Sequence, residues 1–489
     1  MRHPVQLACL LAATSCVRIN PSFEESEIDG ESASGATGSP NADTSTSAQP
    51  TASAGGSSTT KVSTASSIGT SASTTDGPMN VEFTDDAWDG EFALAEELGE
   101  LRWTQNSIQL ERSSDESVLE SRIFDAGSDT DWETLRWTPR APYRTPLQLP
   151  IDGVAAAYPS GNTGLDDLVL LSHLDGGPYV HDAAIVDSTG SHVARWLGAP
   201  NNDAAADIRG VFGRGLAHDD DNDNDAYRIE VLDPVEPGLG AFTWTLWYRS
   251  ESCESMYMVA LDSAAVDPTN TGLHFLGCGG DEFICEDNNP SHAIGFIRGA
   301  GQLATRVCST AVIDDGRWHH IALRRSVVGG GQTVQLFVDG ELSGQTPNLT
   351  AEIADVSVNS SAAAPEEFTL AGGNDGPYSG AGAYDEFALW NRALEPDELA
   401  NLYERGALEA RFQVRACDEP DCSDRDFSGP GGDDIETGYL DPGLQADHTI
   451  DLSGLRLHGR YVQYRFLLRR PEFIRSPAIE AVTVSGTQH

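Results

Sequence analysis

The sequence predicts an all-β protein in which an antiparallel jelly-roll sandwich is inserted into a second, smaller β-sandwich. Three observations predict it. From about residue 166 to 393, short runs of alternating apolar and polar residues are bounded by Gly, Asp, Asn and Pro. Similar alternation stands before and after this region, and only one segment has helical spacing. The elements follow in chain order.

The first sixteen residues have the parts of an export signal. Arg2 and His3 precede an apolar stretch over residues 5–13, and small residues lead to Cys16. The letters AATSC resemble a bacterial lipobox, in which the signal is cut before a cysteine that is then acylated. This resemblance implies a lipid anchor on Cys16, and Val17 after it implies the outer membrane. We therefore expect a lipid-anchored protein of a bacterial envelope, periplasmic or surface-exposed; an ordinary signal peptide cut beyond Cys16 is the alternative.

Residues 17–79 are expected to be a disordered linker. Residues 31–78 are nearly all Ser, Thr, Ala and Gly, and they include no aromatic residue. Such a segment cannot bury enough apolar surface to offset the chain entropy lost on folding. As a flexible coil it would have a root-mean-square reach of about 40 Å.

The charge balance excludes several functions. Acidic residues number 76 against 30 basic ones, which gives a net charge of −46. This field repels phosphate backbones, so we expect no nucleic-acid partner. Lys61 is the only lysine, so the folded region offers none for Schiff-base chemistry. No apolar run reaches the roughly 18 to 20 residues that span a bilayer, so a lipid anchor is the only membrane attachment expected.

Six cysteines of the folded region predict three disulfides in an exported chain. Cys417 and Cys422 are close enough in sequence for a local bridge. The pairing of the other four stays open among three connectivities; they are Cys253, Cys278, Cys285 and Cys308. Their spacing is not that of a zinc site.

Six runs of the middle region alternate strongly enough to predict strands. They are FTWTLWYRS (242–250), MYMVALDS (256–263), GLHFLG (272–277), HAIGFIRG (292–299), HHIALRRS (319–326) and TVQLFVDGEL (333–342). Within the last run, Asp339 and Gly340 predict a two-residue hairpin turn.

The segment EPDELANLYERG (395–406) predicts a short helix. Pro396 suits its first turn, and Leu399, Leu402 and Tyr403 form an apolar stripe. Gly406 is expected to end it.

Four segments together resemble the laminin-G-like, concanavalin A-like (pentraxin-type) jelly rolls. They are LVLLSHLDGGPYVHDAAIVDSTGSHVAR (168–195), GVFGRGLAHDDDNDNDAYRIEV (210–231), DDGRWHHIALRR (314–325) with VQLFVDGELSG (334–344), and GAYDEFALWNRALEPDELANLYERG (382–406). The resemblance covers about half the chain and implies a jelly-roll domain over residues 151–407. It implies little about function, because one sandwich hosts lectins, adhesion modules, spacers and glycosidases.

The two flanks are expected to belong together as one split module, residues 80–150 and 408–489. ESRIFDAGSDTDWETLRWTP (120–139) reads as strand, glycine turn and strand, with too little chain for a sandwich of its own. EARFQVRACDEPDC (409–422) and residues 459–486 supply three further alternating strands. The pattern resembles a β-sandwich module of bacterial surface proteins with a domain inserted at a loop. Two independent small β domains are the alternative.

No catalytic constellation is apparent, and we expect no enzyme. Glycosidases of the resembled family carry an E-x-D-x-E strand, with two carboxylates about 5 Å apart, and this sequence lacks it. Asp385 and Glu386 are neighbours in a strand, so they are expected to face opposite sides and cannot form such a pair. The resemblance implies structural roles for both, in orienting turns at the end of the sheet. His319 and His320 are expected to alternate in the same way.

Two loops are candidate binding sites. In HDDDNDNDAYRIE, crowded carboxylates repel one another, and Ca²⁺ would relieve that repulsion. The candidate calcium ligands are Asp219, Asp221, Asp223 and Asp225. An EF-hand is rejected because Asn224 stands where glycine is required and a strand follows; a solvated hairpin tip is the alternative. In GGNDGPYSGAGAYDE (372–386), the residues Asn374, Asp375 and Tyr378 are expected to form a polar and aromatic rim that suits a sugar. An ordinary glycine-rich loop without a ligand is the alternative.

Together these features predict a non-catalytic cell-surface lipoprotein whose jelly roll binds a glycan or a surface protein, with calcium as the only expected cofactor. A structural envelope scaffold without a small ligand is the first alternative. A polysaccharide-active glycoside hydrolase or lyase is the second.

Overall fold

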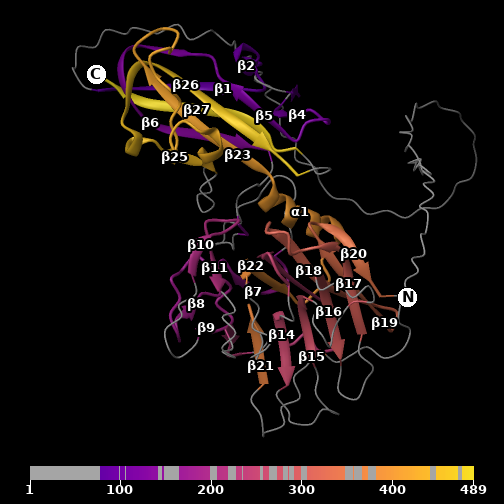
Figure 1. Cartoon of the computed structure of the whole chain (residues 1–489). Helices are drawn as coiled ribbons and strands as arrows, with labels where there is room; N and C mark the ends of the chain where they lie inside the picture. The colour runs from indigo at the N-terminus through magenta and orange to yellow at the C-terminus, as the bar shows by residue number, and fades with distance from the viewer. Residues whose placement is uncertain are drawn as a thin grey trace, which may run out of the picture. The chain divides into compact units, whose positions relative to one another are not determined.

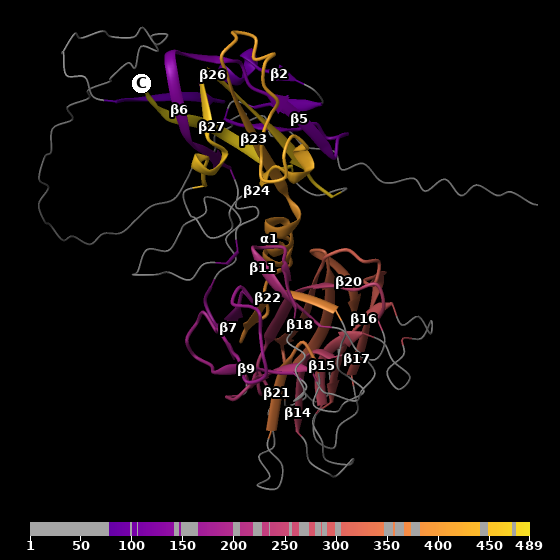
Figure 2. The ribbon, with the colours of Figure 1, turned by 60° about the vertical axis from the view of Figure 1, so that its left-hand side comes forward.

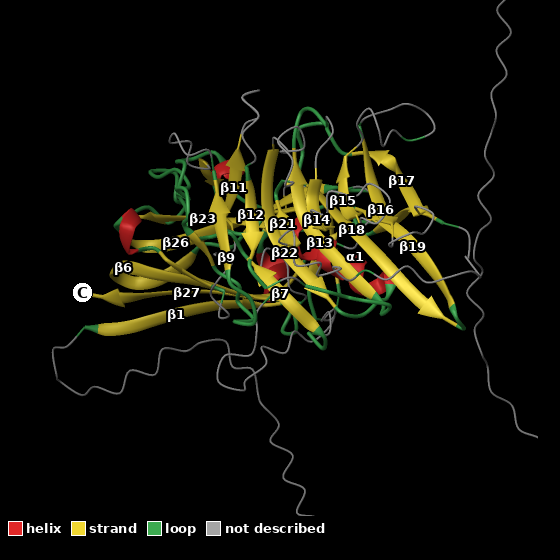
Figure 3. Ribbon diagram, turned by 90° about the horizontal axis from the view of Figure 1, so that it is seen from below, coloured by secondary structure: helices red, strands yellow, loops and turns green. Residues whose placement is uncertain are grey.

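The computed structural model describes most of the chain beyond the linker, within the compact unit Thr75–His489. The described residues are 78–97, 100–104, 106–140, 146–147, 165–198, 206–218, 227–233, 235–253, 257–263, 273–278, 285, 291–298, 305–346, 356, 366–372, 382–440, 448–471 and 476–489. Strands dominate these ranges, and α1 is the α-helix among them (Figure 3). No described helix is long and apolar enough to cross a bilayer. Cys16 and the linker prediction lie outside the described residues.

Two antiparallel sheets form the middle region. The helix-side sheet runs in the order β10 (Ala206–Arg209), β11 (Arg214–His218), β22 (Gly382–Trp390), β13 (Phe242–Arg249), β18 (His319–Val328), β19 (Gly331–Val338) and β20 (Glu341–Gln345), and β7 (Leu168–Ser172) pairs with β22. The opposite sheet runs in the order β17 (Thr305–Val312), β16 (His292–Arg298), β15 (Leu273–Cys278), β14 (Tyr257–Ser263), β21 (Glu366–Leu370), β12 (Arg228–Val231), β9 (Ala194–Leu197) and β8 (Ala184–Ile185).

Figure 2 shows strands of both sheets in the middle region, and buried side chains from the two sheets form one core. Trp244 and Leu246 of β13 belong to the same buried cluster as Leu276 of β15 and Leu370 of β21. The all-β sandwich is therefore as predicted, and the six predicted strands correspond to β13, β14, β15, β16, β18 and the β19–β20 hairpin. Asp339 and Gly340 both have positive φ, 54° and 77°, as a type I′ hairpin turn requires.

Helix α1 (Pro396–Ala407) packs on the outer face of the helix-side sheet. Glu395 and Glu398 form a capping box at its start, and the predicted stripe Leu399, Leu402 and Tyr403 is buried. The sequence suggested that Gly406 ends the helix, but α1 continues to Ala407. Gly406 lies inside the last turn, where an added Cβ would come within 2.3 Å of the Trp247 ring. The glycine is there for close packing.

The strands of the two flanks form a single 11-stranded antiparallel sheet (Figure 1). The first flank supplies β1 (Met79–Asp86), β2 (Glu96–Glu97), β3 (Leu101–Trp103), β4 (Ile108–Leu110), β5 (Glu116–Glu120) and β6 (Phe124–Pro139). The second supplies β23 (Glu409–Cys417), β24 (Tyr439–Leu440), β25 (Thr449–Asp451), β26 (Leu457–Arg469) and β27 (Ala478–Gln488). The sheet also carries the short 3-10 helices η1 (Glu91–Leu94), η3 (Ile435–Thr437) and η4 (Ser453–Leu455).

Strand β6 of the first flank lies between β26 and β27 of the second. Side chains of both flanks share one core, and the Trp137 and Phe412 rings stack there with centroids 4.3 Å apart. The prediction of a glycine turn between two strands in residues 120–139 is wrong, because β6 is a single strand. Gly127 has φ +82° and accompanies a register shift against β26, but the strand continues through it. The domain boundaries themselves stay predictions.

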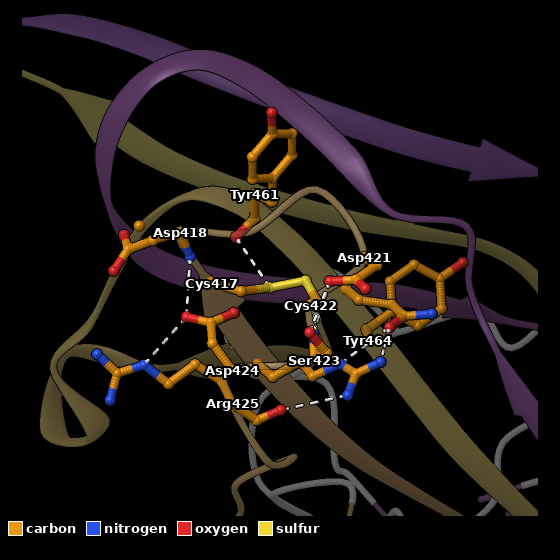
Figure 4. Close-up of a disulfide and its surroundings, with 12 residues drawn as sticks. Cys417, Asp418, Asp421, Cys422, Ser423, Asp424, Arg425, Tyr461 and Tyr464 are labelled. Carbon is orange, nitrogen blue, oxygen red and sulfur yellow. Dashed lines mark hydrogen bonds and ion pairs between the residues drawn. A yellow bond between two sulfur atoms is a disulfide. The ribbon is translucent and has the colours of Figure 1, made fainter.

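Three disulfides link the six cysteines. The predicted bridge between Cys417 and Cys422 is present and closes a short acidic loop (Figure 4). There the Asp418 amide donates to Asp424 Oδ2 (3.2 Å), and the Ser423 amide donates to Asp421 Oδ1 (3.1 Å). The connectivity left open by the sequence is settled by the remaining pairs, Cys253–Cys278 and Cys285–Cys308.

Candidate functional site

Two connections between the sheets of the middle region begin and end on neighbouring residues. Residues 219–226 connect β11 to β12, and residues 373–381 connect β21 to β22. Because β11 pairs with β22 and β12 pairs with β21, the residues that flank the two connections lie at the same end of the sandwich. We call this end, defined by His218, Tyr227, Ala371, Gly372 and Gly382, the inter-sheet edge.

Contacts between the residues that flank the two connections hold this edge together. His218 is the register partner of Gly382, and its Nε2 donates to the Ala371 carbonyl oxygen (3.1 Å). A Cβ at Gly372 would lie 1.9 Å from the Tyr227 carbonyl oxygen, so only glycine allows the two backbones to approach this closely. Segments about 150 residues apart in sequence are thus anchored side by side.

A cluster of aromatic rings lies directly beneath the inter-sheet edge. The His218 ring is 5.7 Å from Tyr384, 5.5 Å from Tyr227 and 5.6 Å from Trp196. All four side chains are buried. Close packing of this kind fixes the backbone from which both connections leave.

The candidate ligands on the two connections lie outside the described residues. These are Asp219, Asp221, Asp223 and Asp225 on the first, and Asn374, Asp375 and Tyr378 on the second. Their roles stay predictions. Within the described ranges, no group of three or more His, Cys, Asp or Glu side chains is arranged to hold a metal ion.

The neighbouring carboxylates of β22 do not face opposite sides of the sheet, contrary to the expectation from alternation. The pairing of β22 with β13 contains a β-bulge, in which Leu246 opposes two residues of β22, and Glu386 adopts φ +52° there. Glu386 therefore lines the same outer cavity as Trp247, which is the register partner of Asp385. A period of two in the sequence cannot reveal such a bulge.

Asp385 is fully buried and holds a loop in place. Its Oδ2 accepts the Phe212 amide (2.9 Å), whereas its Oδ1 has no hydrogen-bond partner among the described residues. Burial, and secondly the adjacent Glu386 carboxylate, raise the pKa of Asp385 well above its ordinary value. The structural role predicted for this carboxyl agrees with these contacts.

Comparison with known proteins identifies the middle region. The model of the concanavalin A-like lectin/glucanases superfamily matches residues 221–400. The middle region is thus similar to concanavalin A-like domains, and we call it the concanavalin A-like domain after this likeness. Neuronal pentraxin-1 of Homo sapiens is 32% identical over 91 residues, which are 19% of this chain and 21% of that protein. Neuronal pentraxin-2 of Cavia porcellus is 30% identical over 90 residues, 18% of this chain and 21% of that protein. The chain thus spans about a fifth of the length of these pentraxins.

Solved structures give weaker likenesses. Domain 4 of an extracellular arabinanase from Geobacillus stearothermophilus, in complex with arabinotriose, has a TM-score of 0.35 at 18% identity, over 48% of this chain and 98% of that one. The receptor binding domain of botulinum neurotoxin D has a TM-score of 0.31 at 10% identity, over 49% of this chain and 52% of that one. A pentraxin from Limulus polyphemus has a TM-score of 0.24 at 14% identity, over 33% of this chain and 70% of that one.

A second polar region of the concanavalin A-like domain lies between the helix-side sheet and α1. His320, Glu386 and Arg405 line a cavity of about 20 Å³, which is room for one water-sized sphere. His173 Nδ1 is in hydrogen-bond contact with Glu386 Oε1. Burial, the largest single cause, lowers the pKa of His173, but the Glu386 and Asp175 carboxylates together raise the pKa overall. The cavity is far too small for a sugar ring.

The pKa values of the two neighbouring histidines of β18 are shifted in opposite directions. Burial lowers the pKa of His320 to about 4, so this ring is neutral near pH 7. His319 lies between two carboxylates, with Nδ1 2.8 Å from Asp339 Oδ2 and Nε2 3.0 Å from Asp315 Oδ1. Burial lowers the pKa of His319, but the two carboxylates raise it overall, which favours the imidazolium form. This ring fastens the start of β18 to the β19–β20 hairpin, a role that the sequence did not reveal.

Proposed function

We propose that the protein is a non-catalytic lipoprotein of a bacterial cell envelope, anchored through Cys16, whose concanavalin A-like domain binds a glycan or a surface protein. Calcium held by the Asp-rich connection assists this binding, and its ligands are Asp219, Asp221, Asp223 and Asp225. The rim of Asn374, Asp375 and Tyr378 on the other connection contacts the ligand. The outer membrane is the proposed location.

The observation that carries this proposal is the shared inter-sheet edge. Two loops that the sequence singles out separately, one for calcium and one for a sugar, leave the fold from neighbouring residues. Calcium takes six to eight oxygen ligands and uses carboxylates readily, so a cation beside the rim can orient both the rim and a ligand hydroxyl. One composite site explains both loop compositions.

The buried carboxylates favour binding over hydrolysis. A retaining glycosidase needs two carboxyl groups about 5 Å apart on either side of an accessible glycosidic bond. Asp385 instead accepts a backbone amide in the interior, and Glu386 contacts His173 beside a cavity that cannot admit a sugar. These contacts support structural roles for both residues.

Calcium is expected to stabilise the full chain against heat. Binding to the folded state alone adds about 2.7 kcal/mol to the unfolding free energy at a calcium concentration 100 times Kd. We expect the double variant Asp221→Asn/Asp223→Asn to lose this shift, because it removes two of the four carboxylates. Asp421→Asn, in the acidic Cys417–Cys422 loop of the split module, is the matched control and should keep the shift. Differential scanning calorimetry with calcium and with a chelator measures it.

A glycan array probed with the full chain tests the ligand. Calcium-dependent retention on one class of glycan supports the proposal. Absence of both a thermal shift and a retained glycan would support a structural envelope scaffold instead. Release of reducing sugar that a single Asp or Glu substitution abolishes would overturn the non-catalytic assignment.

A further inference from the structure

The split module exposes two tryptophans beside η1. Trp88 is 72% exposed and Trp103 is 41% exposed, and Leu94 at the end of η1 is 62% exposed. By contrast, Trp132 and Trp137 of the same module are each 1% exposed. Leaving large apolar rings in water is unfavourable, so paired exposure of this kind suggests a binding surface. We call Trp88, Leu94 and Trp103 the indole platform.

The backbone of the indole platform is fixed by hydrogen bonds and packing. The Trp88 amide donates to Asp86 Oδ1 (2.6 Å), and the Ala87 amide donates to the Glu480 carbonyl of β27 (2.9 Å). Phe92 of η1 is fully buried, and its ring centroid lies 6.5 Å from that of Trp103. The backbone that carries Trp88 is therefore fixed, and the Trp103 ring lies close to η1.

Acidic residues neighbour Trp88 in the chain. Asp86 and Asp89 flank it, and the Asp86 carboxylate accepts the Trp88 amide. Arg122 is a nearby cation, but its guanidinium is engaged with the Asp85 carboxylate (3.1 Å) and lies 3.5 Å from Glu91. With a net charge of −46 for the chain, the surface potential here opposes anionic ligands and favours cations.

We propose that the indole platform binds a polymer of protonated amino sugars. The flat face of each sugar ring stacks on an indole, and its ammonium group meets the indole face and the adjacent carboxylate. Two exposed indoles near η1 match a polymer that repeats a flat face, and the acidic residues beside Trp88 in the chain match its cations. The site is separate from the inter-sheet edge and does not depend on calcium.

Titration of the full chain with glucosamine hexamer and with N-acetylglucosamine hexamer at pH 6 tests this site. The two oligomers share the ring and the linkage, but only the first carries ammonium groups. We expect the deacetylated hexamer to quench tryptophan fluorescence and to bind more tightly. Trp88→Ala is expected to weaken that binding by about tenfold. Asp89→Asn is expected to weaken binding of the deacetylated hexamer alone.

Leu342→Ala is the matched control, because Leu342 is 48% exposed on β20 of the other domain. It should leave binding unchanged, and unchanged melting temperatures should verify that all variants are folded. Equal affinity for the two hexamers, or full binding by Trp88→Ala, overturns the proposal. A blue shift of tryptophan fluorescence with phosphatidylcholine vesicles, together with no binding of either hexamer, would contradict the proposal and assign the platform to a lipid surface. Tighter binding of hexa-arginine with the same dependence on Trp88 would assign it to a basic peptide, and would equally contradict the amino-sugar proposal.

Discussion

Replacing Asp385 by alanine is expected to lower the free energy of unfolding by about 2–5 kcal/mol, because it leaves a buried backbone amide at Phe212 without its acceptor. Asp385→Asn is the control, since its amide oxygen can still accept that hydrogen bond without bringing a charge into the interior. We expect the asparagine variant to lose much less. Urea denaturation monitored by circular dichroism measures both.

The free energy of unfolding of the wild type and of Asp385→Asn should also depend differently on pH. The folded-state pKa of Asp385 is raised above its ordinary value by burial and by Glu386. A group of this kind contributes stability that is fully present below the unfolded pKa near 4 and is lost as the pH rises through the folded pKa. Asparagine does not titrate, so Asp385→Asn should lack this loss. A variant that follows the wild-type pH profile would show that Asp385 is not the titrating group.

Trp137→Ala is expected to cost about 3–5 kcal/mol, as large aromatic truncations in a core do. The indole is 1% exposed and stacks on Phe412, a residue of the other flank. A double-mutant cycle with Phe412→Ala should give a coupling of about 0.5–1.5 kcal/mol. Denaturant unfolding of the two single variants and the double variant measures this coupling.

The control cycle combines Trp137→Ala with Phe368→Ala, because Phe368 lies in the separate core of the concanavalin A-like domain. This pair should be additive to within about 0.5 kcal/mol. Additivity of Trp137→Ala and Phe412→Ala would mean that the two flanks do not share a core, against the single sheet described above.

Local chemistry made much of the fold predictable. Alternation predicted β13 and β18, Asp339 and Gly340 predicted a hairpin, and short spacing predicted the Cys417–Cys422 bridge. These features depend on residues that are neighbours in sequence. The pairing of Cys253 with Cys278 depends on strand order, which the sequence pattern does not contain.

The details around the sites were harder to predict for the same reason. The bulge at Glu386 arises from registration against β13, and the close packing of Gly406 arises from Trp247 on another strand. The strands that flank the two candidate loops are neighbours because β11 pairs with β22 and β12 with β21. Loop composition can suggest ligands, but it does not contain this strand order.

Calorimetric titration with calcium of the wild-type full chain and of its Asp375→Asn variant tests most directly whether the two loops act as one site. Asp375 belongs to the second loop, so its charge affects a cation on the first loop only if they meet. We predict that calcium binds the wild type and that Asp375→Asn weakens its affinity by about fivefold or more. Calcium affinity that is identical in the two proteins, or no calcium binding at all, would contradict the account.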